Sequence, residues 1–204
     1  MGAFGPAEPT PGVQVGVPAF GLVHAVALVL AIGWAAFWTY WLVAAFSMKR
    51  GRVPWGTELR IRVLLVVVVI LLSRLGVFRG HPLRMGPWLA APGLVLFVAG
   101  LGFAIWARVH IGRNWGSPMT RKDDPELVTS GPYRLVRHPI YSGILVAGVG
   151  TALVVGWVWL VAVALAGVYF GYSATVEERW LNERFPDDYP PYRRSTKMLI
   201  PFVL

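Results

Sequence analysis

The sequence predicts an all-α, polytopic membrane protein with about five transmembrane helices, the last two of which form a helical hairpin. Charged residues make up only 14% of the 204 residues, and the mean hydropathy is +0.58. Charged residues are about a quarter of an ordinary soluble domain. The chain also contains four long apolar runs, and about 20 apolar residues are enough for one helix to cross a bilayer. Together these observations exclude a typical soluble fold.

The first three spans follow directly from the first three apolar runs. Residues 1–14, which are rich in Pro and Gly, are expected to form a flexible tail without Lys or Arg. The spans themselves are expected within residues 17–47, 63–73 with its flanks, and 87–107. The chain therefore divides into a region of three membrane helices, residues 15–107, and a second region, residues 108–204, that carries most of the polar chemistry.

The fourth apolar run, residues 138–176, holds 39 residues and is too long for a single span. Gly156 and Trp157 interrupt it near the middle, which predicts two helices at about 139–155 and 157–178. A set of small residues on the first of these helices permits close helix approach and is expected to support a tight hairpin with the second: Gly143, Ala147, Gly148 and Gly150. Such a hairpin brings its two polar ends to the same side of the membrane.

The basic residues give the predicted orientation. The net charge is +9, which in a soluble protein would raise nucleic acid as a partner, but 16 of the 19 Lys and Arg residues fall in alternate loops and the C-terminal tail. Because cytoplasmic loops carry the excess of Lys and Arg, we expect no nucleic acid partner. We expect the N-terminus outside and the C-terminus in the cytosol, in the inner membrane of a bacterium. No Cys is present, which excludes disulfides and thiol nucleophiles, and no metal site is predicted.

The stretch GPYRLVRHPIYSG, residues 131–143, places a polar cluster against an apolar helix. Pro139 suits the first turn of a helix, since the N–H that it lacks would be unpaired there. His138 is then the predicted N-cap, and the open N–H groups of Ile140 and Tyr141 would favour an anion. His138 and Arg137 add donors. The alternative is that Arg137 meets a lipid phosphate and that His138 only caps the helix.

A second polar group lies at the end of the last span, in SATVEERWLNERF. Ser173 and Glu177 are four residues apart and share a helix face, which Tyr169 extends by a further turn. Glu178 is rotated by about 100° from Glu177 and is expected to face elsewhere. A carboxylate here could bind a cationic group or a ribose hydroxyl. The alternative is a solvated helix end at which Glu178 pairs with nearby Arg residues.

Two aromatic segments in the 108–138 loop remain ambiguous at this level. Tyr133 follows the turn residues Ser130, Gly131 and Pro132, and it could offer its ring or hydroxyl to a ligand. It could equally be an interfacial anchor. His110 and the segment Arg113-Asn114-Trp115 are interpreted as interfacial packing.

These residues resemble a known family. VTSGPYRLVRHPIYSG, followed about 35 residues later by EERWLNERFPDDYPPYRR, is similar to the isoprenylcysteine carboxyl methyltransferase family of membrane enzymes. The resemblance covers about residues 101–204 and implies S-adenosylmethionine as cofactor, S-adenosylhomocysteine as product, and a lipophilic or lipidated acceptor in contact with membrane lipids. It implies that the cofactor is bound by Thr120, Glu126, Leu127, Val128, Tyr133, His138, Pro139, Ile140, Tyr141 and Glu177.

The acceptor half of the site departs from the family pattern. Eukaryotic members carry an Arg one turn before the cofactor-binding Glu, and here that position is Ser173. Ser173 and Tyr169 are the predicted acceptor-binding residues, and Arg137 is the candidate cation for an acceptor carboxylate. An amine or hydroxyl acceptor needs a general base, for which Glu178, His110 and Tyr141 are candidates. The alternatives are a phospholipid or other small-lipid N- or O-methyltransferase, an NADPH-dependent enzyme resembling sterol reductases, and a non-catalytic lipid-binding protein.

Overall fold

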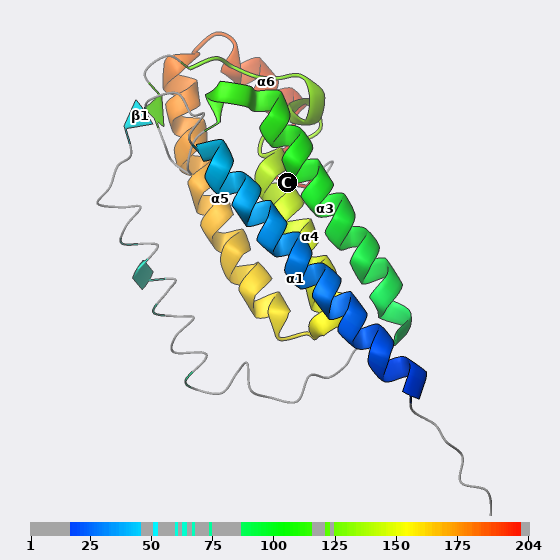
Figure 1. The fold of residues 1–204 in the computed structure, drawn as a ribbon. Coiled ribbons are helices and arrows are strands. Elements are labelled where there is room, and N and C mark those ends of the chain that lie inside the picture. Colours follow the sequence, from blue (N-terminus) through cyan, green and yellow to red (C-terminus); the bar gives the residue numbers. More distant parts are fainter. Residues whose placement is uncertain are drawn as a thin grey trace, which may run out of the picture.

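In a computed structural model, the part of the chain that the structure describes is built mainly of long helices packed along one another (Figure 1). The structure describes residues 17–45, 51–52, 60, 63–64, 67, 74, 87–115, 121–122 and 125–200. The helices are α1 (Val17–Ala45), α3 (Ala90–Ile111), α4 (Pro139–Val155) and α5 (Trp159–Arg184), with the short α6 (Tyr189–Ser195) after them. The predicted tail, most of the predicted second span, and Thr120 lie outside the described residues.

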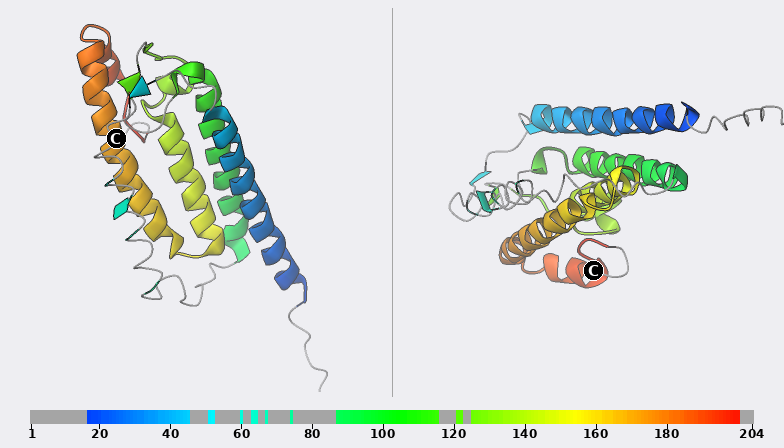
Figure 2. Two further views of the ribbon diagram at one scale, coloured as in Figure 1. Left: turned by 60° about the vertical axis from the view of Figure 1, so that its left-hand side comes forward. Right: turned by 90° about the horizontal axis from the view of Figure 1, so that it is seen from below.

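The long helices lie side by side in the order α1, α3, α4, α5, so that α3 and α4 occupy the centre (Figure 2). Within the described part of the chain, three helices are long and apolar enough to cross a membrane: Ala25–Ala44, Ala90–Asn114 and Trp159–Arg184. Large apolar side chains such as Leu42, Val98 and Val168 are exposed on their outer faces. Exposed apolar surface of this extent is compatible with lipid rather than water, and the protein is an integral membrane protein.

The break between the last two helices falls where the sequence predicts it. α4 ends at Val155, and Gly156 follows with a φ of +146°, a conformation that favours Gly. α5 begins at Trp159 and continues to Arg184, beyond the predicted end at residue 178. α4 is an apolar helix of 17 residues, shorter than the other three. The predicted helical hairpin is therefore present.

The close packing made by the small residues of α4 is directed mainly at α3, not at α5 as the sequence analysis expects. A Cβ atom on Gly143 would lie 2.6 Å from the carbonyl oxygen of Gly100, and one on Gly150 would lie 2.5 Å from that of Gly93. Only Gly148 faces α5, where a Cβ atom would meet Val163 at 2.9 Å. Small residues permit close approach but do not specify the partner helix, which explains the error.

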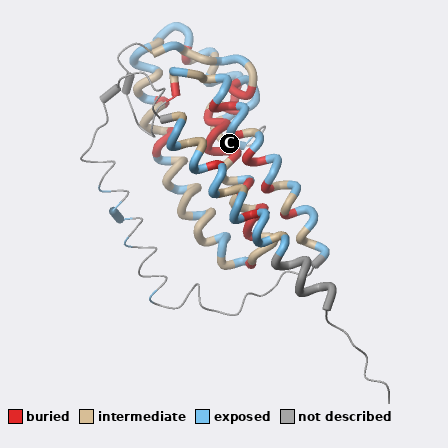
Figure 3. Tube along the Cα trace, viewed as in Figure 1, coloured by how far each residue is buried: buried red, intermediate tan, exposed pale blue. Residues whose placement is uncertain are grey.

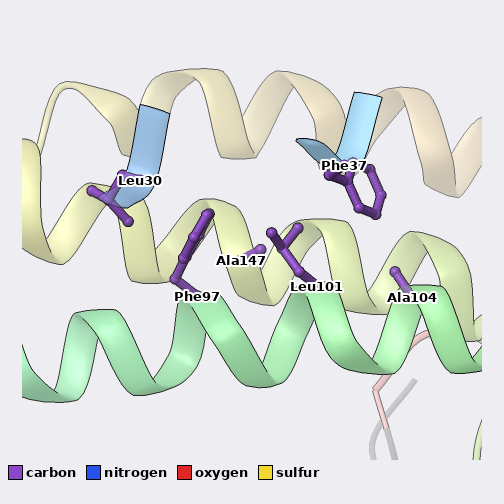
Figure 4. Close-up of a cluster of buried hydrophobic side chains, with 6 residues drawn as sticks. All are labelled: Leu30, Phe37, Phe97, Leu101, Ala104 and Ala147. Atoms are coloured by element: carbon purple, nitrogen blue, oxygen red, sulfur yellow. The ribbon is translucent and has the colours of Figure 1, made fainter. Parts of the chain in front are cut away.

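Buried residues lie along the central helices α3 and α4 and towards the end of the bundle that carries α6 (Figure 3). One cluster joins α1, α3 and α4 through Leu30, Phe37, Phe97, Leu101, Ala104 and Ala147 (Figure 4). A second cluster lies at the polar end and combines residues of α3, α4 and α5 with Trp115 and Tyr133. This second cluster is the apolar base beneath the candidate site.

The polar end of the bundle is closed by short elements. β1 (Gly51–Arg52) pairs antiparallel with β2 (Arg121–Lys122), and the 3₁₀ turns η2 (Gly112–Asn114) and η3 (Gly131–Arg134) follow α3 and precede α4. A further 3₁₀ turn, η1 (Pro87–Leu89), leads into α3 at the other end. Val136 and Lys197 form a parallel bridge, so the C-terminal segment lies beside the start of α4.

Candidate functional site

His138 is the N-cap residue of α4, and Pro139 opens the helix, as predicted from the His-Pro pair. The His138 imidazole makes no capping hydrogen bond. Its ring instead stacks on Tyr141, one turn further along α4, with ring centroids 5.5 Å apart and planes inclined by 4°. Tyr141 in turn stacks on Phe170 of α5 at 4.6 Å. The start of α4 therefore presents a short stack of rings towards α5.

Glu177 on α5 meets this stack. The Tyr141 hydroxyl donates a hydrogen bond of 2.5 Å to Glu177 Oε1, and His138 Nδ1 lies 3.6 Å from Glu177 Oε2. The Glu177 side chain is 24% exposed, so the carboxylate is supported on one side and accessible on the other. The hairpin thus brings the His138 and Glu177 ends together, as the sequence predicts.

Glu178, the next residue, faces a different set of partners. Its side chain is only 5% exposed and lies 2.7 Å from Arg137 Nε, 3.3 Å from His138 Nε2 and 3.4 Å from Arg193 Nε. The rotation of about 100° per residue explains why two adjacent carboxylates diverge in this way. His138 lies between them and contacts both.

The chain's own C-terminal segment covers the residues before α4. The N–H of Arg137 donates to the Lys197 carbonyl at 2.8 Å, and the N–H of His138 donates to the Met198 carbonyl at 3.0 Å. The Arg137 guanidinium also donates to the carbonyls of Arg193 and Thr196. The donors of Arg137 and His138 that the sequence analysis directs towards an anion are therefore engaged by the tail and by Glu178.

Tyr133 belongs to η3, which precedes α4, and is 7% exposed, so it is a buried side chain rather than an interfacial anchor. Its carbonyl accepts a 2.6 Å hydrogen bond from the Tyr192 hydroxyl of α6. Burial raises the pKa of the Tyr133 phenol well above its ordinary value, and the nearby negative charge of Glu177 raises it further. The phenol is therefore a neutral group across the physiological range.

The loop from 125 to 130 has no regular secondary structure and is attached to the end of α3. Asn114 Nδ2 donates to Glu126 Oε2 at 3.1 Å, and His110 Nε2 lies 2.9 Å from Ser130 Oγ. Val128 packs against the second buried cluster. The predicted cofactor-lining residues Glu126, Leu127 and Val128 are thus on the same end of the bundle as Tyr133 and Glu177.

The two predicted acceptor-binding residues lie one and two turns before Glu177. Ser173 is fully buried, and its hydroxyl donates to the carbonyl of Tyr169 at 2.8 Å. Tyr169 itself is half-buried and packs against Phe170. Ser173 therefore presents neither a charge nor an accessible hydroxyl.

One buried arginine of this region is not identified by the sequence analysis as a functional residue. Arg108 in the last turn of α3 is 4% exposed and donates to the carbonyls of Ala44 and Gly112 at 2.9 and 2.8 Å. Its guanidinium also lies 4.5 Å from the centre of the buried Trp115 ring. An Arg in the last turn of an apolar helix with a Trp seven residues later is a weak sequence signal for such a contact. Arg108 joins the ends of α1 and α3 beneath the loop.

An apolar groove of about 480 Å³ lies elsewhere, between α1 and α3. It is lined by Val29, Ile32, Gly33, Phe97, Val98, Leu101, Gly102 and Ile105. None of the polar groups described above lines it, and its residues are those of a membrane-facing surface. The candidate site is therefore placed at the polar end, where the charged and aromatic side chains converge.

Comparisons with known proteins indicate the family to which the chain is similar. A family model described as phospholipid methyltransferase matches residues 88–188. Protein-S-isoprenylcysteine O-methyltransferase B of Arabidopsis thaliana is 29% identical over 145 residues, which are 69% of this chain and 72% of that protein. The cobalt-zinc-cadmium resistance protein CzcN of Cupriavidus metallidurans is 32% identical over 148 residues, which are 71% of this chain and 65% of that protein.

A solved structure of the eukaryotic intramembrane Ras methyltransferase ICMT (isoprenylcysteine carboxyl methyltransferase) shares the fold, with a TM-score of 0.52 and 23% identity, over 72% of this chain and 53% of that one. The solved structure shares the helical fold, and the sequence matches to proteins named as methyltransferases indicate a membrane methyltransferase. The chain belongs to the isoprenylcysteine carboxyl methyltransferase family. It spans between 53% and 72% of the length of the relatives described here.

Proposed function

We propose that this protein transfers a methyl group from S-adenosylmethionine to a lipophilic acceptor at the membrane interface. The observation that supports the proposal most directly is the Glu177 carboxylate, which Tyr141 and His138 orient at the junction of α4 and α5. This junction joins the two motifs that resemble the family. A partly exposed carboxylate beside aromatic rings suits a ligand that carries both hydroxyl groups and positive charge.

The residues present fit this cofactor. Glu177 supplies an acceptor for an ammonium group or a ribose hydroxyl, and Tyr133 supplies a buried neutral phenol nearby. When bound, S-adenosylmethionine supplies a methyl group on a sulfonium, and in-line transfer leaves S-adenosylhomocysteine. The protein's task in such a transfer is alignment and a short approach distance. We assign cofactor binding to Thr120, Glu126, Leu127, Val128, Tyr133, His138, Pro139, Ile140, Tyr141 and Glu177.

Arg137 and Glu178 are proposed as positioning residues rather than as groups that touch the acceptor. The two side chains are 9% and 5% exposed and pair with each other at 2.7 Å. Arg137 also binds two tail carbonyls, and Glu178 also contacts His138 and Arg193. A carboxylate surrounded by cations is a poor proton acceptor. The pair is better suited to fixing His138, and with it the start of α4.

The acceptor is proposed to be lipophilic because the outer faces of the long helices are apolar, so that a molecule with a hydrocarbon tail can approach through the bilayer. An isoprenylcysteine-like carboxylate is one candidate, and a phospholipid or other small lipid is another. The buried Ser173 lacks the positive charge that eukaryotic members offer a carboxylate at this position. Tyr169, one turn earlier and half-buried, is the residue proposed to contact the acceptor.

The proposed orientation has the N-terminus outside and the candidate site in the cytosol, in the inner membrane of a bacterium. The support is the distribution of Lys and Arg among the loops. Fusions of a cytosol-active reporter to Leu204 and of a periplasm-active reporter to Met1 test this orientation. Activity of both reporters is expected, and inactivity of both fusions in a protein that is stably inserted in the membrane would overturn the orientation.

The function is tested by transfer of a labelled methyl group from S-adenosylmethionine in a detergent-purified preparation. The acceptors offered are farnesylcysteine analogues, and separately a native bacterial lipid extract. Label in the organic phase that depends on the protein supports the proposal, and the labelled species identifies the acceptor. Binding of NADPH in the absence of S-adenosylmethionine binding would instead favour a reductase on the same scaffold.

A further inference from the structure

Two hydrogen bonds attach one loop to the end of α3, and neither is explained by the roles assigned above. His110 Nε2 lies 2.9 Å from Ser130 Oγ, and Asn114 Nδ2 donates to Glu126 Oε2 at 3.1 Å. His110 lies in the last turn of α3, and Asn114 ends η2 four residues later. The two contacts bracket Leu127 and Val128, to which the proposed function assigns cofactor binding. We call residues 126–130 the cofactor loop.

The position of His110 is fixed by shape as well as by its hydrogen bond. A Cβ atom on Gly131 would lie 2.7 to 2.9 Å from three atoms of the imidazole, so the ring rests directly against the Gly131 backbone. Gly131 has a φ of +59°, which favours Gly over any larger residue. The ring also stacks on Tyr133, with centroids 6.4 Å apart and an angle of 26°. His110 is therefore fitted to the end of the cofactor loop.

Asn114 is directed at the other end of the loop. Among the described residues its buried Oδ1 has no hydrogen-bond partner, so the bond from Nδ2 to Glu126 is the one that orients the amide. Buried polar atoms are normally paired. Because the Asn114 amide is held by a single donor contact, its orientation depends on that contact. Asn114 and His110 thus secure opposite ends of a loop that has no hydrogen-bonded ladder of its own.

We propose that His110 and Asn114 are positioning residues that hold the cofactor loop in its binding conformation. The proposal rests on the proposed function, because it gives the two residues an effect on S-adenosylmethionine affinity. Holding a loop in its bound conformation removes an ordering penalty from binding. Loss of either contact therefore weakens cofactor binding without changing the groups that align the methyl transfer.

A double-mutant cycle on His110 and Ser130 tests the proposal. His110→Phe keeps a ring against Gly131 and Tyr133 but removes the hydrogen bond, Ser130→Ala removes the same bond from the loop side, and the double variant removes both partners. One neutral hydrogen bond corresponds to about a three- to ten-fold change in an equilibrium constant. Each single variant should therefore raise the Kd for S-adenosylmethionine by about that factor, and the double variant should raise it no further.

Three further variants separate positioning from general stability. His110→Gln, whose amide can reach Ser130, should restore affinity towards the wild type, and Asn114→Ala should weaken binding to a similar degree as His110→Phe. Asn182→Ala, at an exposed site on α5, is the matched control and should have no effect. Hydrogen exchange of residues 125–131 should be faster in the weakened variants, while KM for S-adenosylmethionine rises and kcat at saturation changes by less than about two-fold.

The outcomes separate the two proposals. If the wild-type protein does not bind S-adenosylmethionine, the proposed function fails and the positioning role falls with it. If the wild type binds and His110→Phe and Asn114→Ala bind equally well, the positioning role alone is wrong. Effects of His110→Phe and Ser130→Ala that multiply in the double variant would also overturn it, because they would show that the two residues act independently.

Discussion

Removal of the Glu178 carboxylate should destabilise the whole polar end of the bundle. Glu178→Ala deletes a carboxylate that is 5% exposed and leaves Arg137, 9% exposed, without its ionic partner. Breaking a buried ion pair by removing one member costs about 3–5 kcal/mol. Arg137 retains its bonds to the tail carbonyls and Arg193 is largely exposed, so the lower end of this range, about 3 kcal/mol, is the expected loss.

The loss converts to a shift in thermal unfolding. A chain of this size changes its Tm by about 2–4 °C per kcal/mol, so Glu178→Ala should lower the Tm by about 6–12 °C. The assay is thermal unfolding in detergent, followed by circular dichroism at 222 nm. Glu183→Ala is the matched control, because Glu183 lies on the same helix and is exposed, and it should shift the Tm by about 1 °C or less.

A further variant separates the charge of Glu178 from the size of its side chain. Glu178→Gln keeps the size of the side chain but removes its charge, and it should fall between Glu178→Ala and the wild type. If Glu178→Ala unfolds at the same temperature as Glu183→Ala, the ion pair contributes nothing measurable. The positioning role that we assign to Arg137 and Glu178 would then be wrong.

Two further predictions concern packing and alkaline stability. Gly100→Ala would place a Cβ atom 2.4 Å from the backbone nitrogen of Ala147 and should destabilise the protein by about 2–3 kcal/mol or more in thermal unfolding. Gly102→Ala is the control, because a Cβ atom there would have nothing within 4 Å, and it should be neutral or slightly stabilising. Burial raises the pKa of the Tyr192 phenol; since the unfolded phenol ionises first, stability should be lost as pH rises above about 10. Tyr192→Phe should therefore lose less stability than the wild type between pH 10 and 11. At pH 7 this variant lacks the bond to the Tyr133 carbonyl and should be about 1 kcal/mol less stable than the wild type. Equal losses of stability in the two proteins above pH 10 would contradict the pKa assignment.

Local rules are sufficient for several parts of the site. Pro139 predicts the start of α4 because Pro is favoured in a first turn, and Gly156 predicts its end because few other residues adopt a positive φ. The divergence of Glu177 and Glu178 follows from the rotation per residue of an α-helix. Each of these inferences depends only on neighbours within a few positions of the chain.

Contacts between distant segments are not predictable from such rules. The carbonyls of Lys197 and Met198 accept bonds from Arg137 and His138, yet the tail sequence has no periodicity that would indicate a partner. Backbone groups bond irrespective of side chain, so this pairing leaves little trace in the sequence. For the same reason, local rules predict an anion, and not the chain's own tail, as the partner of the donors at the start of α4.

The partner of a small-residue surface is ambiguous for a related reason. Gly143 and Gly150 indicate a close helix contact, but the backbone of any neighbouring helix can occupy the space that they leave. The structure has α3 in that position, with Gly93 and Gly100 facing the two glycines of α4. The glycines of α3 are the sequence signal that could have identified the partner, since both helices carry small residues at matching depth.

The central claim is that Glu177 binds S-adenosylmethionine at the junction of α4 and α5, and calorimetric titration of the purified protein tests it most directly. Glu177→Gln keeps the size of the side chain and removes the charge, and loss of a charged hydrogen bond corresponds to about a ten- to hundred-fold increase in Kd. Glu183→Gln on the same helix should bind like the wild type. Equal affinity of the wild type and Glu177→Gln, or no binding by the wild type at millimolar cofactor, would contradict the claim.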